Sequence, residues 1–419
     1  MTSSMKQRIV QLRQGKVPKG YKKSKLGIVP NDWNETAFST LFTSTSQYTD
    51  DLSRYPLYSL TIEDGITAKT ERYERSHLVK KENAYKVVRP GDYAYNPMNI
   101  RFGAVARHKG SVPVAVSGYY DIFTTVHEGD FAFMDSFLTS DSMIAYYNKV
   151  STGSLIEKQR VHFSDFMEFS LALPPIEERK RIAEILTAQD KVIELKEKRL
   201  AEKQRQKKYL MQQLLTGKKR LNGFSGEWEV KCLCDACYLV TKCTTGELCD
   251  YVSTENMAAE LKNNVCFEDS QQERQGIEFV KGDILIANIR PYLKKVWKAT
   301  KCGVCSADVL VLRPTSVSSE FLYRLIANDD FFSYVMIAAK GSKMPRGDKK
   351  HIMSMPITLP ISEKEQMAIS KFMNTVDNEL ELFVDELTHE KQKKKALIQL
   401  LLTGIVRVKE ATGSRFPTK

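Results

Sequence analysis

The sequence contains one long segment twice, and this duplication limits the folds open to the chain. A block starting at Leu173 begins LPPIEERKRIAEIL, and a block starting at Leu359 begins LPISEKEQMAISKF. Both blocks close on Leu-Leu-Thr-Gly, at 214–217 and 401–404, so that one residue inserted after the proline brings them into register at an offset of 187. A repeat of this length predicts that one supersecondary unit is built twice.

Both blocks have the apolar pattern of a long helix. In the second block apolar residues recur at alternating steps of four and three, as in a coiled-coil seam, and the first block keeps apolar residues at matching places. Gly217 and Gly404 stand where a left-handed C-terminal cap belongs. About 35 helical residues at 1.5 Å each make a rod about 50 Å long. A single stripe usually packs on its own domain, but two stripes of equal length predict that the helices pair. The seam residues are Ile182, Leu186, Ile193, Leu200, Leu210 and Leu214 in the first block, and Ile369, Met373, Val376, Leu380, Phe383 and Leu387 in the second.

The segments outside these blocks repeat a frame as well. Trp33 and Trp228 open comparable segments, PGDYAYN resembles KGDILIAN, and residues 6–16 resemble the end of the first helical block at 208–218. The expected fold is α+β, with two globular α/β-type domains joined by two long antiparallel coiled-coil helices in a cyclic, pseudo-twofold repeat. The expected boundaries are 1–27 for an N-terminal stub packed beside the end of the last helix, 28–172 for the first domain, 173–221 for the central helix, 222–358 for the second domain, and 359–419 for the last helix and tail.

The charge of the chain favours a polyanionic partner. The formal net charge is +12, and the N-terminal segment 1–28 holds eight basic residues and no acidic ones. Residues 177–221 hold fourteen basic and seven acidic residues, whereas 363–408 hold seven basic and eight acidic ones. Because basic side chains that neutralise phosphates release counterions, the first helix should attract nucleic acid more strongly than the second.

Several functional classes lack their sequence signals. No apolar run reaches the roughly 18 to 20 residues that cross a bilayer, and no apolar stretch follows the basic N-terminus, so a cytoplasmic protein is expected. The chain contains no G-x-G and no phosphate-binding loop of the G-x-x-x-x-G-K type. We therefore expect no cofactor and no catalysis by this chain alone. The six histidines form no spaced ligand pair, so no metal is expected from them.

These motifs together resemble the specificity subunits of type I restriction-modification systems. The resemblance rests on LALPPIEERKRIAEIL followed by QQLLTGKKRL, on the second edition TLPISEKEQMAISKFM with QLLLTG, and on the tryptophan-glutamate opening of the second domain. It covers nearly the whole chain, although SEKEQM is a looser match than EERKRI. The resemblance implies two target-recognition domains that each read half of a split DNA target, with the helices as a ruler between the halves.

The resemblance also implies partners. They are double-stranded DNA, two modification subunits that supply adenine methylation, and restriction subunits that translocate DNA; no membrane is involved. A ruler about 50 Å long suggests half-sites on the order of 10 bp apart, centre to centre. The alternative is a coiled-coil adaptor whose globular domains bind proteins, and DNA binding with and without the modification subunit would distinguish the two.

The cysteines of the second domain could hold a metal ion or could lie reduced in its core. All eight lie between Cys232 and Cys305, and the pairs Cys234/Cys237 and Cys302/Cys305 have the spacing of a four-thiolate zinc site. Reduced cysteines buried in a core need no metal, and we expect that arrangement instead. Disulfides are not expected in the cytoplasm.

DNA should be read by polar side chains on loops of the two domains. The segments GSLIEKQR and GSKMPRGDKK rank highest, because each joins a Gly-Ser turn to a basic cluster at matching places. The basic run at 203–208 either lies against phosphates or docks a modification subunit. The candidates are Asn96, Asn99, Arg101, Arg107, Lys158, Gln159 and Arg160 in the first domain, and Asn288, Arg290, Tyr292, Lys294, Lys295, Lys343, Arg346 and Lys349 in the second.

Overall fold

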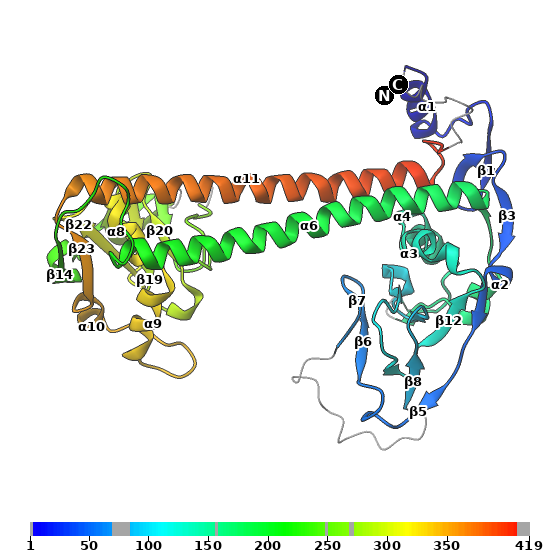
Figure 1. Ribbon diagram of the computed structural model, residues 1–419, viewed down its shortest axis with the longest axis horizontal. Coiled ribbons are helices and arrows are strands. Elements are labelled where there is room, and N and C mark those ends of the chain that lie inside the picture. Colours follow the sequence, from blue (N-terminus) through cyan, green and yellow to red (C-terminus); the bar gives the residue numbers. More distant parts are fainter. Residues whose placement is uncertain (1–2, 69–83, 156–157, 248–249, 268–271, 409–419) are drawn as a thin grey trace. The chain divides into compact units, whose positions relative to one another are not determined.

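A computed structural model describes residues 3–68, 84–155, 158–247, 250–267 and 272–408. Its internal contacts divide the chain into two compact units, Met1–Lys196 with Glu386–Lys419 (unit 1) and Glu197–Asp385 (unit 2). Each unit consists of a globular domain together with the start of one long helix and the end of the other (Figure 1). The expected fold class, α+β with two globular domains and two long helices, is confirmed.

The two long helices are α6 (Ile176–Leu215) and α11 (Glu363–Leu402), each of 40 residues and thus longer than expected. Both carry glutamates in the first turn, where a negative charge favours the helix dipole. Both end in the same cap. Gly217 and Gly404 have φ of 69° and 66°. After them, Lys219 N donates to Gln213 O and Val406 N donates to Leu400 O, each at 3.0 Å.

Within each unit, α6 and α11 run antiparallel, as predicted. Ion pairs link them, and partner numbers fall on one helix as they rise on the other. The seam residues Val376, Leu380 and Leu387 are half-buried, while the apolar residues near the helix starts are fully buried against the domains. The ion pairs are Lys196–Glu386 (3.1 Å) and Lys394–Asp190 (2.5 Å) in unit 1, and Lys203–Glu379 (2.7 Å) and Lys207–Asp377 (2.5 Å) in unit 2.

Unit 1 contains two main antiparallel sheets, with strand orders β10-β9-β12-β4 and β11-β8-β5. Two-stranded pairs join β13 to β3, β1 to β2 and β6 to β7. The strands are β1 Tyr21–Ser24, β2 Gly27–Pro30, β3 Asn34–Ala37, β4 Phe42–Ser44, β5 Tyr48–Thr49, β6 Tyr58–Thr61, β7 Gly65–Ala68, β8 Tyr85–Val88, β9 Tyr93–Tyr95, β10 Val105–Arg107, β11 Val114–Ser117, β12 Asp121–Thr125 and β13 Ser170–Leu173. The short helices are α1 Ser3–Arg13, α2 Phe38–Leu41, α3 Phe131–Phe137, α4 Asp141–Val150, α5 Phe163–Met167, and the 3₁₀ turns η3 Ile100–Phe102 and η4 Glu128–Asp130.

Unit 2 repeats this plan, with sheets β15-β22-β19-β20 and β16-β18-β21-β17 and the pair β14-β23. The strands are β14 Trp228–Cys232, β15 Cys237–Leu239, β16 Cys243–Glu247, β17 Tyr251–Val252, β18 Glu273–Phe279, β19 Ile284–Ala287, β20 Val296–Lys298, β21 Gly303–Cys305, β22 Val309–Pro314 and β23 Pro356–Pro360. The short helices are α7 Leu233–Ala236, α8 Ser319–Ile326, α9 Asp329–Ile337, α10 Lys349–Met353 and the 3₁₀ turn η7 Pro291–Leu293.

The two domains therefore share one topology. Strands β4, β9, β10 and β12 have the same order in their sheet as β15, β19, β20 and β22. In each unit a helix pair follows the sheet. The strand that leads into a long helix pairs with the strand just before a four-residue helix, β13 with β3 before α2 and β23 with β14 before α7. The frame that the sequence repeats is thus a structural repeat.

Each hydrophobic core takes residues from both long helices. The unit 1 core includes Ile182 and Leu186 from α6 and Leu401 from α11, all at most 2% exposed. The unit 2 core includes Leu214 from α6 and Ile369 and Met373 from α11. Because helix ends are part of the cores, removing either end would expose apolar surface. No helix in the described ranges has the length and apolar character that a bilayer crossing requires.

Candidate nucleic-acid interface

In unit 1 the two candidate loops lie against each other. One follows β9 and contains η3; the other joins α4 to α5 and is closed by reciprocal backbone hydrogen bonds of 2.9 Å between Thr152 and Arg160. The Arg101 guanidinium donates to Gln159 Oε1 across the two loops. Residues 156–157 of the second loop lie outside the described residues.

Unit 2 brings the matching loops together. Asn288 follows β19 and precedes η7, and the second loop joins α9 to α10. Arg290 N donates to Pro345 O at 2.8 Å, and Gly347 N donates to Asn288 O at 3.3 Å. Two segments more than 50 positions apart in the sequence therefore form one surface in each unit.

The structure sorts the fifteen candidate side chains by exposure. Exposed side chains can contact phosphates or base edges without rearrangement, whereas buried ones are packed inside the domain and would have to move. The exposed candidates are Asn99, Lys158, Arg160, Arg290, Tyr292, Lys343, Arg346 and Lys349; the half-buried ones are Arg107, Gln159, Lys294 and Lys295; the buried ones are Asn96, Arg101 and Asn288.

The two buried asparagines stand at equivalent turns. Asn96 Oδ1 accepts a hydrogen bond from Met98 N at 3.1 Å, which is an Asx turn that shapes the loop before η3. Asn288 Oδ1 is buried and has no hydrogen-bond partner within the described part of the chain. The Oδ1 of Asn288 therefore gives its turn no hydrogen bond like the one that Asn96 provides.

Arg107 is held by a carboxylate. Its Nε and Nη2 each donate to an oxygen of Asp135 at 2.9 Å, and its guanidinium lies 4.8 Å from the centroid of the Phe131 ring. Burial opposes ionisation of Asp135, but the hydrogen bonds from Arg107 and the charge of Lys109 outweigh it and lower the pKa of this carboxyl. Arg107 must leave this pair before it can bind DNA.

The loop with η7 is strained. Arg290 and Lys294, which flank η7, have left-handed φ of 54° and 50°. Glu260 and Leu261, with φ of 59° and 60°, are the other non-glycine residues in the described ranges that share this conformation. Their N–H groups donate at 3.0 Å to the carbonyls of Leu293 and Lys294. Such strain concentrates at functional sites and persists where the surroundings enforce it.

Asp329 joins this loop to the long helix. Its two oxygens bind Lys294 of the loop and Lys208 of α6, each at 2.5 Å. Hydrogen bonds from Lys208 and Lys294 lower the pKa of Asp329, so the carboxylate stays charged at neutral pH.

The basic run of α6 is engaged inside unit 2. Lys203 and Lys207 pair with α11, and Lys208 pairs with Asp329. Of these three lysines only Lys208 keeps most of its side chain, 63%, in solvent, and Arg205 of the same run is exposed as well. A phosphate or a partner subunit would therefore meet these lysines in competition with carboxylates of the same chain.

The cysteines do not form the four-thiolate arrangement. Cys237 is buried and donates to Leu233 O at 3.4 Å, and Cys305 belongs to a different hydrophobic cluster. The expectation of buried cysteines holds for these two and is wrong for the exposed ones, which are Cys232, Cys234, Cys243, Cys266 and Cys302. Cys249 lies outside the described residues.

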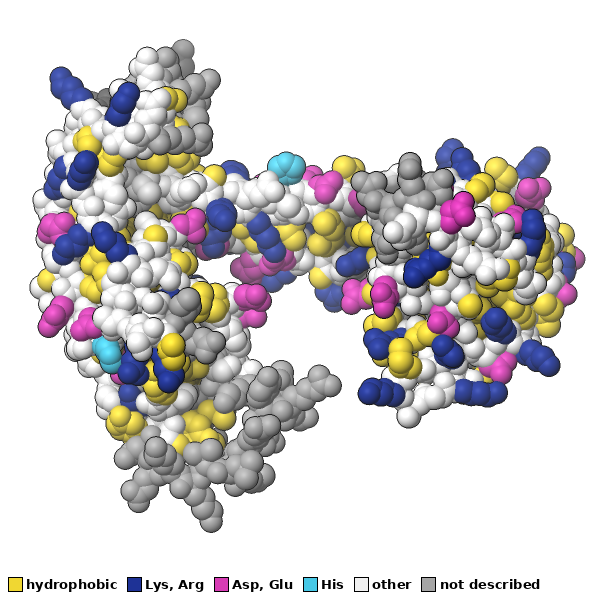
Figure 2. Space-filling model, turned by 180° about the vertical axis from the view of Figure 1, so that it is seen from behind, with side chains coloured by type: hydrophobic (Ala, Val, Ile, Leu, Met, Phe, Trp, Pro, Cys, Tyr) yellow, Lys and Arg dark blue, Asp and Glu magenta, His cyan; other side chains and the backbone are white. Residues whose placement is uncertain are grey.

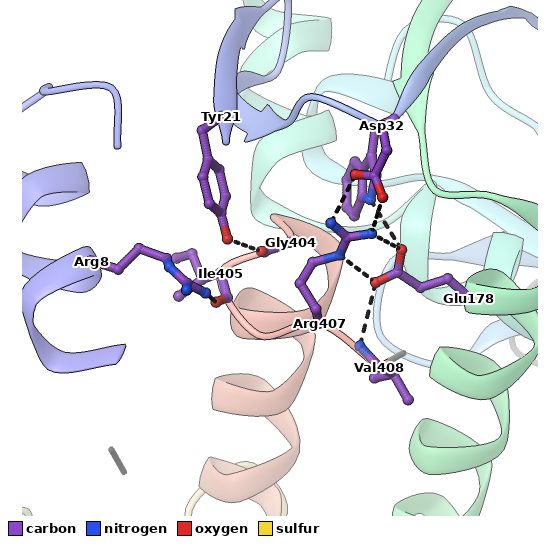
Figure 3. A network of polar contacts seen from close by, with 9 residues as sticks. Arg8, Tyr21, Asp32, Glu178, Gly404, Ile405, Arg407 and Val408 are labelled. Carbon is purple, nitrogen blue, oxygen red and sulfur yellow. Dashed lines mark hydrogen bonds and ion pairs between the residues drawn. The ribbon is translucent and has the colours of Figure 1, made fainter. Parts of the chain in front are cut away.

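A polar clamp closes unit 1 and was not predicted from the sequence (Figure 3). Arg407, just after α11, donates to both oxygens of Glu178 at 2.7 and 2.8 Å and to both oxygens of Asp32 at 2.8 and 2.7 Å. Hydrogen bonds to Glu178 and then Asp32 raise the pKa of Arg407. Trp33 Nε1 adds a hydrogen bond of 3.3 Å to Glu178.

The N-terminal stub packs against the same turn. Arg8 Nη1 donates to Ile405 O at 3.1 Å, and the Tyr21 hydroxyl donates to Gly404 O at 2.8 Å (Figure 3). The stub therefore binds carbonyls of the turn that follows α11.

Unit 2 has the equivalent clamp. Arg220 donates to Glu365 at 2.6 and 2.7 Å, and its guanidinium lies 5.4 Å from the centroid of the Trp228 ring. The offset of 187 relates Arg220 to Arg407 and Glu178 to Glu365. This signal was present in the sequence and would have revealed both clamps.

Each unit also has a cleft between the end of a long helix and the turn that joins two short helices. The unit 1 cleft, about 480 Å³, lies beside the α3–α4 turn, and the unit 2 cleft, about 300 Å³, lies beside the α8–α9 turn. Seven helix positions, equivalent in the repeat, line each of the two clefts. They are Gln204, Lys207, Lys208, Met211, Gln212, Leu215 and Thr216 in unit 2, and Lys391, Lys394, Lys395, Ile398, Gln399, Leu402 and Thr403 in unit 1.

The surface of unit 2 is rich in basic side chains. In Figure 2 they gather along the lower edge of this unit, on the side where Figure 1 draws α9 and the loop that follows it. A basic edge beside the candidate loops fits an interface with a polyanion.

Comparison with known proteins identifies the family. The sequence model of the family described as the type I restriction modification DNA specificity domain matches residues 131–204 and 225–387, more than half of the chain. The chain belongs to this family. The matched ranges include the start of α6 in the first case and the whole domain of unit 2 in the second.

Individual relatives are also specificity subunits of type I restriction enzymes. The MjaVIII specificity subunit of Methanocaldococcus jannaschii is 24% identical over 58% of this chain and 64% of its own length. The EcoDI specificity subunit of Escherichia coli is 31% identical over 29% of this chain and 26% of its own length. The putative MjaX specificity subunit of M. jannaschii is 23% identical over 93% and 97%. The chain thus spans less than two thirds of the first two relatives and nearly all of the third.

Two solved structures share the fold. A chain from work on complex assembly and conformational transition of the type I restriction-modification system has a TM-score of 0.56 at 15% identity, over 90% of this chain and 99% of that one. The type I S subunit from M. genitalium has a TM-score of 0.51 at 13% identity, over 91% and 99%.

Proposed function

We propose that this chain is the DNA specificity subunit of a type I restriction-modification enzyme and that each unit reads one half of a split target. One observation carries the proposal: both units bring two polar loops together at the same place in a duplicated fold. Exposed basic side chains line both surfaces, Lys158 and Arg160 in unit 1 and Arg290, Lys343, Arg346 and Lys349 in unit 2. Such side chains bind phosphates and guanine edges.

The unit 2 surface offers the sharper test. Lys343, Arg346 and Lys349 changed together to alanine should weaken binding of target DNA. The slope of log affinity against log salt should fall by up to about 3, because each lost phosphate contact removes about 0.9. The matched control is Lys281→Ala, an exposed lysine that precedes β19 at the opposite end from Asn288. Unchanged affinity and slope in the triple variant would exclude this surface.

We infer further that two modification subunits dock on the matched clefts, and that the paired helices fix the gap between half-sites. The support is the set of seven lining positions that both units share, since two copies of one partner need two comparable faces. Gln212→Arg and Gln399→Arg, at exposed cleft positions, should each remove one modification subunit, and the double variant should remove both. Gln392→Arg, exposed on α11 outside the cleft, is the control. Native mass spectrometry would count the bound subunits.

The chain is proposed to contribute recognition and no catalytic group. Incubated with DNA and a labelled methyl donor, the purified chain should transfer no methyl group, and transfer should begin when modification subunits are added. Transfer by the chain alone would contradict this assignment.

A further inference from the structure

We propose that Cys232, Cys234 and Asp235 of unit 2 form a binding site for a thiophilic divalent cation such as Zn²⁺. All three side chains are exposed, and their ligand atoms lie within 4.8 Å of one another. This ligand set differs from the four-thiolate set that the sequence suggests, because Cys237 turns into the core.

The first turn of α7 orients the three ligands. Cys232 stands at the N-cap and Asp235 at the third helical position, and Cys232 N donates to Asp235 Oδ2 at 3.0 Å. The other oxygen, Oδ1, accepts from the Cys234 thiol at 3.9 Å. The backbone thus fixes the carboxylate next to both sulfur atoms, which reduces the entropy that a cation has to overcome on binding.

The duplicated fold shows that the frame does not require these side chains. In unit 1 the equivalent short helix α2 follows β3 in the same way, and its first N–H donates to Phe169 O just as Leu233 N donates to Met355 O. The positions equivalent to Cys232, Cys234 and Asp235 are Ala37, Ser39 and Thr40. One copy of the junction is therefore built without any thiol or carboxylate, and the other presents two thiols and a carboxylate together.

Two thiolates and one carboxylate suit a tetrahedral borderline-soft cation, with water as the fourth ligand. Zn–S bonds of about 2.3 Å and Zn–O bonds of about 2.1 Å require ligand atoms roughly 3.5 Å apart, a small closure of the present cluster. Because cysteine binds Zn²⁺ as the thiolate, a bound cation must displace the proton of each thiol.

The position of the site indicates its effect. Cys232 ends β14, and the Asp235 carbonyl accepts a hydrogen bond of 2.8 Å from Ser316 beyond β22. A cation would tie the end of β14 to the start of α7 and through it to the main sheet. We therefore expect it to stabilise unit 2 rather than to take part in chemistry.

The test uses the full chain, reduced by a phosphine and freed of metal by dialysis, with Co²⁺ as the probe. Co²⁺ bound by thiolates gives a charge-transfer band, which should saturate at a single equivalent and be abolished by excess Zn²⁺. Cys232→Ser and Cys234→Ser should each lose the band, and Asp235→Asn should weaken the affinity by about 10-fold or more. Serine is a preferred N-cap, so Cys232→Ser should keep the fold, which circular dichroism checks.

Cys243→Ser and Cys266→Ser are the controls, because both cysteines are exposed in unit 2 and lie outside the cluster. Both variants should keep the band. The proposal is overturned if the reduced chain gives no saturable band, if the band persists in Cys232→Ser and Cys234→Ser, or if a control variant loses it. Thermal unfolding adds a second readout: Zn²⁺ should raise the midpoint of the original chain and of the controls, and leave the two serine variants unchanged.

Discussion

Arg220 holds a carboxylate that has almost no access to water. The Glu365 side chain is 1% exposed and receives two hydrogen bonds from the guanidinium. Arg220→Met would leave this charge buried without its partner, and we expect a loss of about 3–5 kcal/mol in the free energy of unfolding. Urea titration measures it. The control, Lys180→Met, breaks the exposed pair with Glu177 and should cost no more than about 1 kcal/mol. Equal costs would show that the buried clamp adds nothing.

Asp329 should affect both loop order and pH dependence. Asp329→Asn removes the charge that binds Lys208 and Lys294, so hydrogen exchange at the η7 loop should become faster and affinity for the unit 2 half-site should fall. Because the pKa of Asp329 is lowered in the folded chain, its stabilisation is present above the ordinary carboxyl pKa and is lost as pH falls through the lowered value. The stability difference between the two proteins should therefore shrink at acidic pH. A difference that persists there would assign the effect to packing.

At the scale of residues, the sequence predicted the candidate loops better than it predicted which of their side chains are exposed. In each unit the Gly-Ser segment lies against the asparagine turn, a contact that the sequence did not predict. Asn96, Arg101 and Asn288 are nevertheless buried. Side-chain direction just after a short strand depends on the pleat and on the following turn, and neither is encoded in residue type. That these loops contact DNA remains a prediction.

At the scale of elements, three glycines end helices in the same left-handed conformation but in different surroundings. Gly15 has φ of 68° and open space around its Cα, whereas a Cβ on Gly404 would lie 2.5 Å from Pro30 and 3.1 Å from Trp33. Gly15→Ala should cost about 1 kcal/mol through backbone strain alone. Gly404→Ala should cost about 1–3 kcal/mol more through overpacking. Thermal unfolding compares the two, and equal midpoints would mean that the segment with Pro30 and Trp33 shifts freely to make room.

The elements differ in how well their sequence predicts them. The long helices carry a regular apolar period over many turns, so their existence and antiparallel pairing followed from pattern. The strands are mostly two to five residues long, which is too short for an alternation to be distinguished from chance. The helices exceed the expected length because their first turns, at Glu177 and Glu363, precede the apolar seam.

At the scale of the whole molecule, two separate cores predict two separable unfolding transitions. The chain has three tryptophans: Trp33 in unit 1, and Trp228 and Trp297 in unit 2. With Trp33→Phe, fluorescence reports unit 2, and Arg220→Met should lower the urea midpoint. With Trp228→Phe and Trp297→Phe together, Trp33 reports unit 1, and the same change should leave the midpoint in place. Equal shifts would show that the long helices unfold both units as one.

The duplication made the whole plan predictable, because an internal repeat compares the chain with itself and needs no spatial information. The expected boundaries treat the helices as elements apart from the domains, while the contacts assign the ends of α6 and α11 to both cores. A pattern of apolar residues shows that a face is buried, but not which surface buries it. The cysteine cluster depends on such placement, whereas the matched arginine and glutamate positions of the two clamps are visible in the repeat.

Because α11 contributes to both cores, the two domains finish folding at different times during synthesis. Unit 2 is continuous in sequence, but the core of unit 1 includes Leu401 and Leu402, which are translated about 200 residues after the rest of that domain. At about 5–20 residues per second, the first domain waits roughly 10–40 s with an apolar groove, the surface that Leu401 and Leu402 later cover, exposed. The domain that is synthesised first is therefore the last to finish folding, and during that interval the groove is where a chaperone would bind.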